Sequence, residues 1–138
     1  TMINNYAKNH LLPAPDKKKY SKEHLLLLIY IYYYKSILSI GDIQSLLEPL
    51  TQRYFHKDGE MNMQSIYEEV FSLEKEQVEK MKQDVTEKYE TASRIFPEAE
   101  AEDQEFLRIF SFICLLSFDV YVKKQVIEKL IDELPKKS

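Results

Sequence analysis

The side chains best suited to binding a partner lie within the first twenty positions of this sequence. Asn4 and Asn5 carry amides, which can contact the N6 and N7 edge of adenine through two hydrogen bonds. Lys8, Lys17, Lys18 and Lys19 could contact phosphates, which would make binding to DNA depend on salt. The plainer interpretation is that the asparagines are solvated and the lysines belong to a polar turn.

The distribution of charge favours the phosphate interpretation more than the total does. The net charge of −4 by itself disfavours a nucleic-acid partner. Residues 1–35, however, hold six lysines against Asp16 and Glu23, a balance of +4, so the remainder carries −8. A basic end on an acidic body is typical of a protein that touches phosphate with one end only.

Other kinds of site lack their usual signatures. His10, His24 and His56 are far apart and have no companion ligands at metal spacing; we expect His24 to lie at the surface or to cap a helix. Cys114 lies in an apolar run, the setting of an inert buried thiol. The sequence contains no Ser-His-Asp order and no glycine-rich phosphate loop. We therefore expect no enzyme activity, no cofactor and no metal.

The sequence gives no sign of secretion or of a membrane partner. A single cysteine and the lack of a secretory signal favour a cytoplasmic protein. The longest near-apolar run, Phe106–Phe118, is interrupted by Arg108 and is shorter than the ~20 residues that cross a bilayer. We expect this run to form a buried helix.

The elements that position these residues are predicted to be helices, because two glycines and five prolines leave few sites for tight turns. A short helix is expected over Met2–Asn9. Ser21 is a cap for a second helix over 22–38. Ser39 and Asp42 form a variant capping box for a third helix, which Pro49 should end or bend.

The Asp58-Gly59 pair marks the clearest loop. It divides the chain into residues 1–57, a DNA-binding region, and residues 58–138, a helical bundle or dimerisation region. Apolar residues at helical spacing predict one long amphipathic helix over 63–96 and another over 103–133. Because residues 106–122 of the second helix are apolar nearly all round, they need more cover than one helix pair gives. We expect a bundle that also dimerises.

Several segments of the first half together form a recognisable pattern. They are Ile3-Asn4-Asn5-Tyr6, Leu11-Leu12-Pro13, Tyr20-Ser21-x-Glu23-His24-Leu25 and Leu38-Ser39-Ile40-x-Asp42-Ile43-x-x-Leu46-Leu47. Over residues 1–50 this pattern resembles the DNA-binding head of MerR-type regulators, winged helix-turn-helix proteins that bind DNA as dimers. The resemblance implies a recognition helix followed by a basic wing, with a scaffold helix expected upstream of Thr1.

The chain is also similar to an uncharacterised bacterial family, the domain of unknown function numbered 1836. Its members share the patterns Met-Ile-Asn-Asn-Tyr, Leu-Leu-Pro-x-Pro and Lys-Lys-Tyr-Ser-x-Glu-His-Leu, followed by a helical C-terminal part. That family has no assigned biochemistry. From the MerR pattern the chain departs at Asn4 and Asn5, which replace Arg and Tyr, and at His10, which replaces a turn glycine and would be strained in a left-handed conformation.

The predicted fold is all-α, with a MerR-like winged helix-turn-helix head that lacks its first helix, joined to a C-terminal bundle of long helices. The predicted function is a transcriptional regulator that binds double-stranded DNA as a homodimer, its effector being unknown. The predicted DNA contacts are Asn4, Asn5, Tyr6, Lys8, Lys17, Lys18, Lys19 and Tyr20. The alternative is a protein-interaction module with a degenerate helix-turn-helix, which the departures at Asn4 and Asn5 and the acidic body favour.

Overall fold

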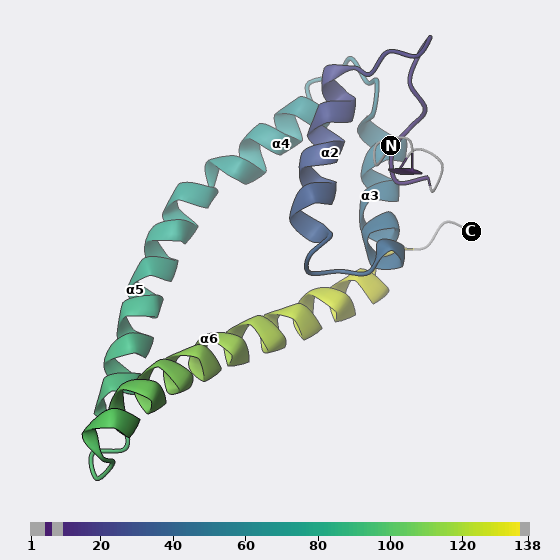
Figure 1. The fold of residues 1–138 in the computed structure, drawn as a ribbon. Coiled ribbons are helices and arrows are strands. Elements are labelled where there is room, and N and C mark those ends of the chain that lie inside the picture. Colours follow the sequence, from purple (N-terminus) through teal and green to yellow (C-terminus); the bar gives the residue numbers. More distant parts are fainter. Residues whose placement is uncertain (1–4, 7–9, 136–138) are drawn as a thin grey trace. The chain divides into compact units, whose positions relative to one another are not determined.

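The computed structural model describes residues 5–6 and 10–135, and within them the chain is mostly helical and has no β-strand (Figure 1). The helices are α2 (Lys22–Tyr34), α3 (Ile40–Tyr54), α4 (Met63–Ser72), α5 (Glu74–Arg94) and α6 (Ala101–Asp132). The predicted all-α fold is confirmed. Asn5 and Tyr6 are helical too, while the rest of the helix predicted over 2–9 lies outside the described residues.

Helices α2 and α3 begin at the predicted serine caps. The Ser21 hydroxyl accepts a hydrogen bond from the backbone N–H of His24 at 3.3 Å. The Ser39 hydroxyl accepts one from the backbone N–H of Asp42 at 3.1 Å. Each bond satisfies an N–H group that has no partner in the first turn, which stabilises a helix by about 1 kcal/mol.

The predicted extents of two helices differ from those observed. Helix α2 ends at Tyr34, before the predicted end at Leu38. In the turn that follows, the N–H groups of Ile37 and Leu38 both donate to the Tyr34 carbonyl, at 2.9 and 2.8 Å. Helix α3 continues through Pro49 to Tyr54, so Pro49 does not end it.

The prediction of one helix over 63–96 is wrong, because Leu73 separates α4 from α5. At this junction the Ser72 hydroxyl donates to the carbonyl of Glu69 at 2.6 Å. A hydroxyl bonded to a carbonyl of the preceding turn draws that carbonyl away from the helix axis and commonly bends a helix.

The chain divides into two compact units, residues 1–72 with 127–138, which we call the head, and residues 73–126, which we call the helical hairpin. In the head, α4 packs against both α2 and α3. The Asp58-Gly59 loop is observed where it was predicted, and the helix after it belongs to the head. Whether residues 1–57 and 58–138 act as separate domains stays a prediction.

The core of the head forms where apolar faces of its helices meet. Leu27 and Ile31 of α2, Ile43 of α3 and Met63 of α4 are fully buried, and Ile131 from the end of α6 joins the same core. Burying an aliphatic side chain of this size stabilises a fold by about 1.5–3 kcal/mol. The head therefore contains an ordinary hydrophobic core that can hold its surface loops in place.

The helical hairpin consists of α5 and the greater part of α6, which are in contact through a few side chains. The ring of Tyr89 packs edge-to-face on Phe112, with centroids 5.4 Å apart. Lys88 Nζ lies 2.8 Å from Asp119 Oδ2. The prediction of a helix over 103–133 is confirmed by α6. Its apolar middle, expected to be buried, is instead largely exposed.

Candidate nucleic-acid interface

Residues Asp16 to Lys19 form a tight turn, which we call the lysine turn. The N–H of Asp16 donates to the Lys19 carbonyl at 3.1 Å, and the N–H of Lys19 donates to the Asp16 carbonyl at 2.8 Å. The φ angles of Lys17 and Lys18 are 50° and 66°. Positive φ at both central positions defines a type I′ turn, the usual turn of a two-residue hairpin.

Both central positions of the lysine turn hold residues that ordinarily avoid this conformation. A side chain at positive φ brings Cβ close to the following carbonyl oxygen, which costs roughly 1–2 kcal/mol for each residue. Asparagine and glycine are preferred in such turns for that reason. Lys17, Lys18 and Lys19 are all exposed, so the strained backbone presents three adjacent ammonium groups to solvent. Local strain of this kind is concentrated at functional sites.

His24 fixes the segment that leads into the lysine turn to the start of α2. The residue is 1% exposed, and its Nε2 lies 3.1 Å from the Pro13 carbonyl and 3.3 Å from that of Ala14. Nδ1 accepts the backbone N–H of Ser21 at 2.9 Å. Because carbonyls only accept, Nε2 carries the proton in this arrangement. The predicted capping role is confirmed, while the predicted surface location is wrong.

Aromatic and charged contacts extend this anchor to the end of α3. The His24 ring packs edge-to-face against Tyr20 and Phe55, with centroids 5.2 and 4.9 Å apart. Glu23 Oε1 lies 2.9 Å from His56 Nδ1, and Glu23 Oε2 accepts the backbone N–H of His56 at 2.8 Å. Sequence reasoning did not find these contacts, because His24 and His56 come together only when α2 packs beside α3.

The other predicted contact residues fall in different settings. Asn5 is helical and exposed, and Tyr20 is 40% exposed. Tyr6 is partly buried against the core of the head, and its carbonyl accepts the N–H groups of Leu11 and Leu12 at 2.9 and 3.2 Å. Tyr6 therefore anchors the N-terminal segment to the core.

Two predicted contacts, Asn4 and Lys8, lie outside the described residues. His10, just after them, has a φ of 63°, which confirms the strain expected where a side chain replaces a turn glycine. Among the described residues of the predicted interface, the exposed ones are therefore the lysine turn, Tyr20 and Asn5.

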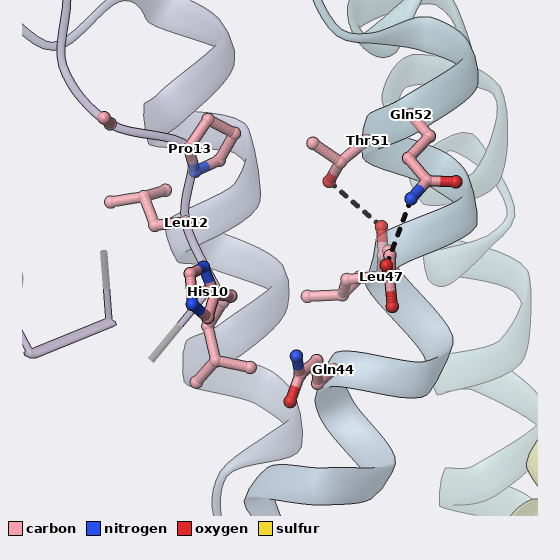
Figure 2. Close-up of a pocket in the computed structure, with 10 residues that line it drawn as sticks. His10, Leu12, Pro13, Gln44, Leu47, Thr51 and Gln52 are labelled. Carbon is pink, nitrogen blue, oxygen red and sulfur yellow. Dashed lines mark hydrogen bonds between the residues drawn. The ribbon is translucent and has the colours of Figure 1, made fainter. Parts of the chain in front are cut away.

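A groove of about 320 Å³ lies between the segment 10–14 and α3 (Figure 2). His10, Leu12 and Pro13 line one side, and Leu47 of α3 lines the other. The hydroxyl of Thr51 donates to the Leu47 carbonyl at 3.0 Å, so it is engaged within α3. The groove therefore lies where the segment 10–14 packs beside α3.

Residues 5–6 and 10–135 contain no cluster of three His, Cys, Asp or Glu side chains that could hold a metal ion. None of the helices α2 to α6 is both long and apolar enough to cross a bilayer. Cys114 of α6 is half-buried, whereas the sequence predicted a buried thiol.

The sequence profile of the family described as Domain of unknown function (DUF1836) matches residues 1–70. The chain belongs to this family. The matched residues include the lysine turn, α2, α3 and most of α4, so the family pattern coincides with the head and not with the helical hairpin. Searches of curated proteins and of solved structures gave no significant match.

Proposed function

We propose that the head is the DNA-binding module of a MerR-like transcriptional regulator, with the lysine turn as its wing. The observation that carries the proposal is the exposed type I′ turn, which places Lys17 and Lys18 at its tip and Lys19 beside them. Phosphate contacts of this kind fix the position of a protein on the duplex without reading its sequence.

The anchoring of the turn supports this role. His24 ties the preceding segment to α2, and Glu23 ties α2 to the end of α3. A turn held in this way loses little conformational freedom when it binds, so more of the phosphate interaction contributes to affinity. The acidic remainder of the chain would orient the basic end towards DNA.

We assign contacts with the base edges to Asn4 and Asn5, and contacts with the phosphates to Lys8 and Tyr20. The exposed amide of Asn5 suits contact with adenine in the major groove. Binding as a homodimer is part of the proposal, since two heads would then contact two half-sites and roughly double the number of phosphate contacts.

The test compares the wild-type chain with a Lys17→Ala, Lys18→Ala, Lys19→Ala variant in binding to labelled duplex DNA, measured by fluorescence anisotropy. At about 50 mM salt we expect at least a tenfold loss of affinity. The slope of log affinity against log salt should flatten by about 2–3, because each phosphate contact contributes about 0.9.

The matched control is a Lys75→Ala, Lys80→Ala, Lys82→Ala variant of α5, which changes the net charge by the same amount. Lys80 and Lys82 are exposed and paired with Glu76 and Glu79. We expect this variant to bind DNA as the wild type does. Equal losses in both variants, or no binding by the wild-type chain to a pool of genomic fragments at low salt, would contradict the proposal.

The alternative function is a protein-interaction module with a degenerate helix-turn-helix. Exposed apolar side chains on α2 favour it. Leu25 and Tyr32 are both exposed and lie about two turns apart on the same side of this helix, and exposed apolar surface can mark a protein interface. A partner that co-purifies with the chain, and whose binding is lost in a Leu25→Asp, Tyr32→Asp variant but kept in the lysine-turn variant, would decide for this alternative.

A further inference from the structure

A cavity of about 470 Å³ lies at the end of the helical hairpin where α5 leads into α6. Arg94 at the end of α5, Phe96 in the connector and Arg108 on α6 all line it. This volume is within the range of about 300–1,000 Å³ that is usual for small-molecule sites. All the lining residues belong to one compact unit, residues 73–126, so the hairpin by itself forms the cavity.

Arginine is rare in this chain and is concentrated at the cavity. The chain has three arginines among its 19 lysines and arginines, and two of the three, Arg94 and Arg108, line the cavity. A guanidinium group presents several N–H donors in one plane and can bind a phosphate or a carboxylate through two parallel hydrogen bonds, which an ammonium group cannot do. Two guanidinium groups at one cavity therefore favour an oxyanion as its ligand.

Neither of these two arginines is engaged in an ion pair. Within residues 5–6 and 10–135, the ion pairs involve His56 and lysines of α5. The Nε atom of Arg108 is buried and has no hydrogen-bond partner in the same part of the chain. A buried N–H group without an acceptor is costly, and an oxygen atom of a bound oxyanion would supply that acceptor.

Other contacts hold the walls of the cavity in place. Arg108 Cζ lies 6.0 Å from the centroid of the Tyr89 ring of α5, which is within the range of a cation–π contact. The Gln104 amide donates to the carbonyls of Pro97 and Ala99, at 3.3 and 2.8 Å, and so ties the connector to the start of α6. A site that is formed in advance loses little conformational freedom when a ligand binds.

The charges around the cavity are mixed. Ala101, the first residue of α6, also lines it, and the free N–H groups of a helix start attract an anion. Glu105 lines it as well, and Glu102 and Asp103 lie in the first turn of α6. These carboxylates reduce the attraction of anions from a distance. We therefore expect affinity to come from direct hydrogen bonds with the guanidinium groups.

We propose that this cavity binds a small molecule through an oxyanion group, either a phosphate or a carboxylate, held by the guanidinium groups of Arg94 and Arg108. The Nε–H of Arg108 donates to one oxygen atom of the ligand. Glu105, three residues before Arg108 on α6, weakens the binding by repulsion. The site goes beyond the proposed DNA binding and does not depend on it, because none of its residues belongs to the head.

The test is a titration of the full chain with inorganic phosphate, followed by nuclear magnetic resonance of the arginine Nε–H groups. One spectrum contains all three arginines, so Arg53 of α3, which lies outside the cavity, is the internal control. In about 0.1 M sodium chloride, which screens general attraction between ions, the Arg94 and Arg108 signals should shift and saturate, with half-saturation at about 1 mM or below. The Arg53 signal should not follow them.

A parallel titration with acetate distinguishes the two kinds of oxyanion. Tighter binding of phosphate would identify a phosphate-bearing ligand, and tighter binding of acetate would identify a carboxylate. Signals of Arg94 and Arg108 that shift without saturation with either probe, or no more than the signal of Arg53, would overturn the proposal.

Variants of the lining residues locate the site. Arg108→Gln should weaken phosphate binding by about tenfold or more, and so should Arg94→Lys, which keeps the positive charge but loses the planar donors. Because Arg94 is exposed, its variant should keep the helical circular dichroism spectrum of the wild type. Glu105→Gln should bind phosphate more tightly, and Arg53→Gln, the matched control, should bind as the wild type does. Unchanged binding in both cavity arginine variants, or equal losses in Arg53→Gln, would also overturn the proposal.

Discussion

The head and the helical hairpin are stabilised in different ways. In the head, large apolar side chains such as Leu27 and Ile43 are fully buried between helices. In the hairpin, the buried described residues are the small Ala92 and Ser111, and α5 meets α6 through an aromatic contact and an ion pair. The head has a core of its own, whereas the hairpin leaves much of its apolar surface uncovered.

This difference indicates what each region can bind. A region with a complete core can hold a strained polar loop at its surface, and the head holds the lysine turn in this way. A region that exposes large apolar side chains gains most from a partner that buries them. We therefore infer that the head binds a charged partner and that the apolar middle of α6 binds an apolar one.

The largest expected effect is on the stability of the head. Leu27→Ala should lower the free energy of unfolding by about 2–5 kcal/mol, because Leu27 is 0% exposed and truncation leaves a cavity. Leu25→Ala, on the same helix at 56% exposure, should change it by less than about 0.5 kcal/mol. Urea unfolding measures both variants. If both variants lost the same free energy of unfolding, α2 would not have one buried side and one exposed side.

The next effect concerns the anchor beneath the lysine turn. His24→Ala removes the partner of the Pro13 and Ala14 carbonyls and of the Ser21 N–H. A fully buried polar group left without a partner costs about 1–3 kcal/mol. The three groups here are only partly buried, so water replaces His24 in part, and we expect a total loss of about 2–4 kcal/mol by thermal unfolding. His56→Ala removes a side-chain contact with Glu23 whose histidine is largely exposed and should cost less than about 1 kcal/mol. A larger loss for His56→Ala would contradict the anchoring role of His24.

A smaller effect is expected in the hairpin, and it should depend on pH. A hydrogen bond from Lys88 lowers the pKa of Asp119 below its usual 3.8, and the same bond raises the pKa of Lys88 above 10.5. The ion pair therefore stabilises the hairpin at neutral pH. Its contribution should be lost as the pH falls through the lowered pKa of Asp119, or rises through the raised pKa of Lys88.

Lys88→Met tests this pH dependence. The pKa of Asp119, followed by nuclear magnetic resonance of its carboxyl carbon, should return towards 3.8, and the stability difference from the wild type should vanish at acid pH. Lys82→Met provides the control, because Lys82 pairs with Glu79 of its own helix. An unchanged pKa of Asp119 in Lys88→Met would show that the pair does not hold in solution.

Local features of the sequence predicted much of the fold. The caps at Ser21 and Ser39 involve groups three residues apart, so their residue types and spacing were enough to find them. The strain at His10 followed from one side chain at a turn position. The sequence did not predict the break between α4 and α5 at Leu73, because apolar residues keep their helical spacing on both sides of it.

Features that depend on contacts distant in sequence could not be predicted. The burial of His24 requires Phe55, from the end of α3, to pack against its ring. The apolar middle of α6 predicted a buried helix, whereas α5 covers only one of its sides. Periodicity shows that a face is apolar but not which element covers it. In the candidate nucleic-acid interface, the sequence predicted a polar, basic turn at Lys17–Lys19. The structure shows in addition that this turn is of type I′.

The most direct test of the DNA-binding proposal separates the shape of the lysine turn from its charge. A Lys17→Asn, Lys18→Gly variant introduces the pair preferred in type I′ turns, so the turn should persist and the free energy of unfolding should rise by about 1–2 kcal/mol as strain is relieved. Affinity for duplex DNA at low salt should nevertheless fall, because two phosphate contacts are lost. A more stable variant that binds DNA with undiminished affinity and an unchanged salt slope would contradict the assignment of the lysine turn as the wing.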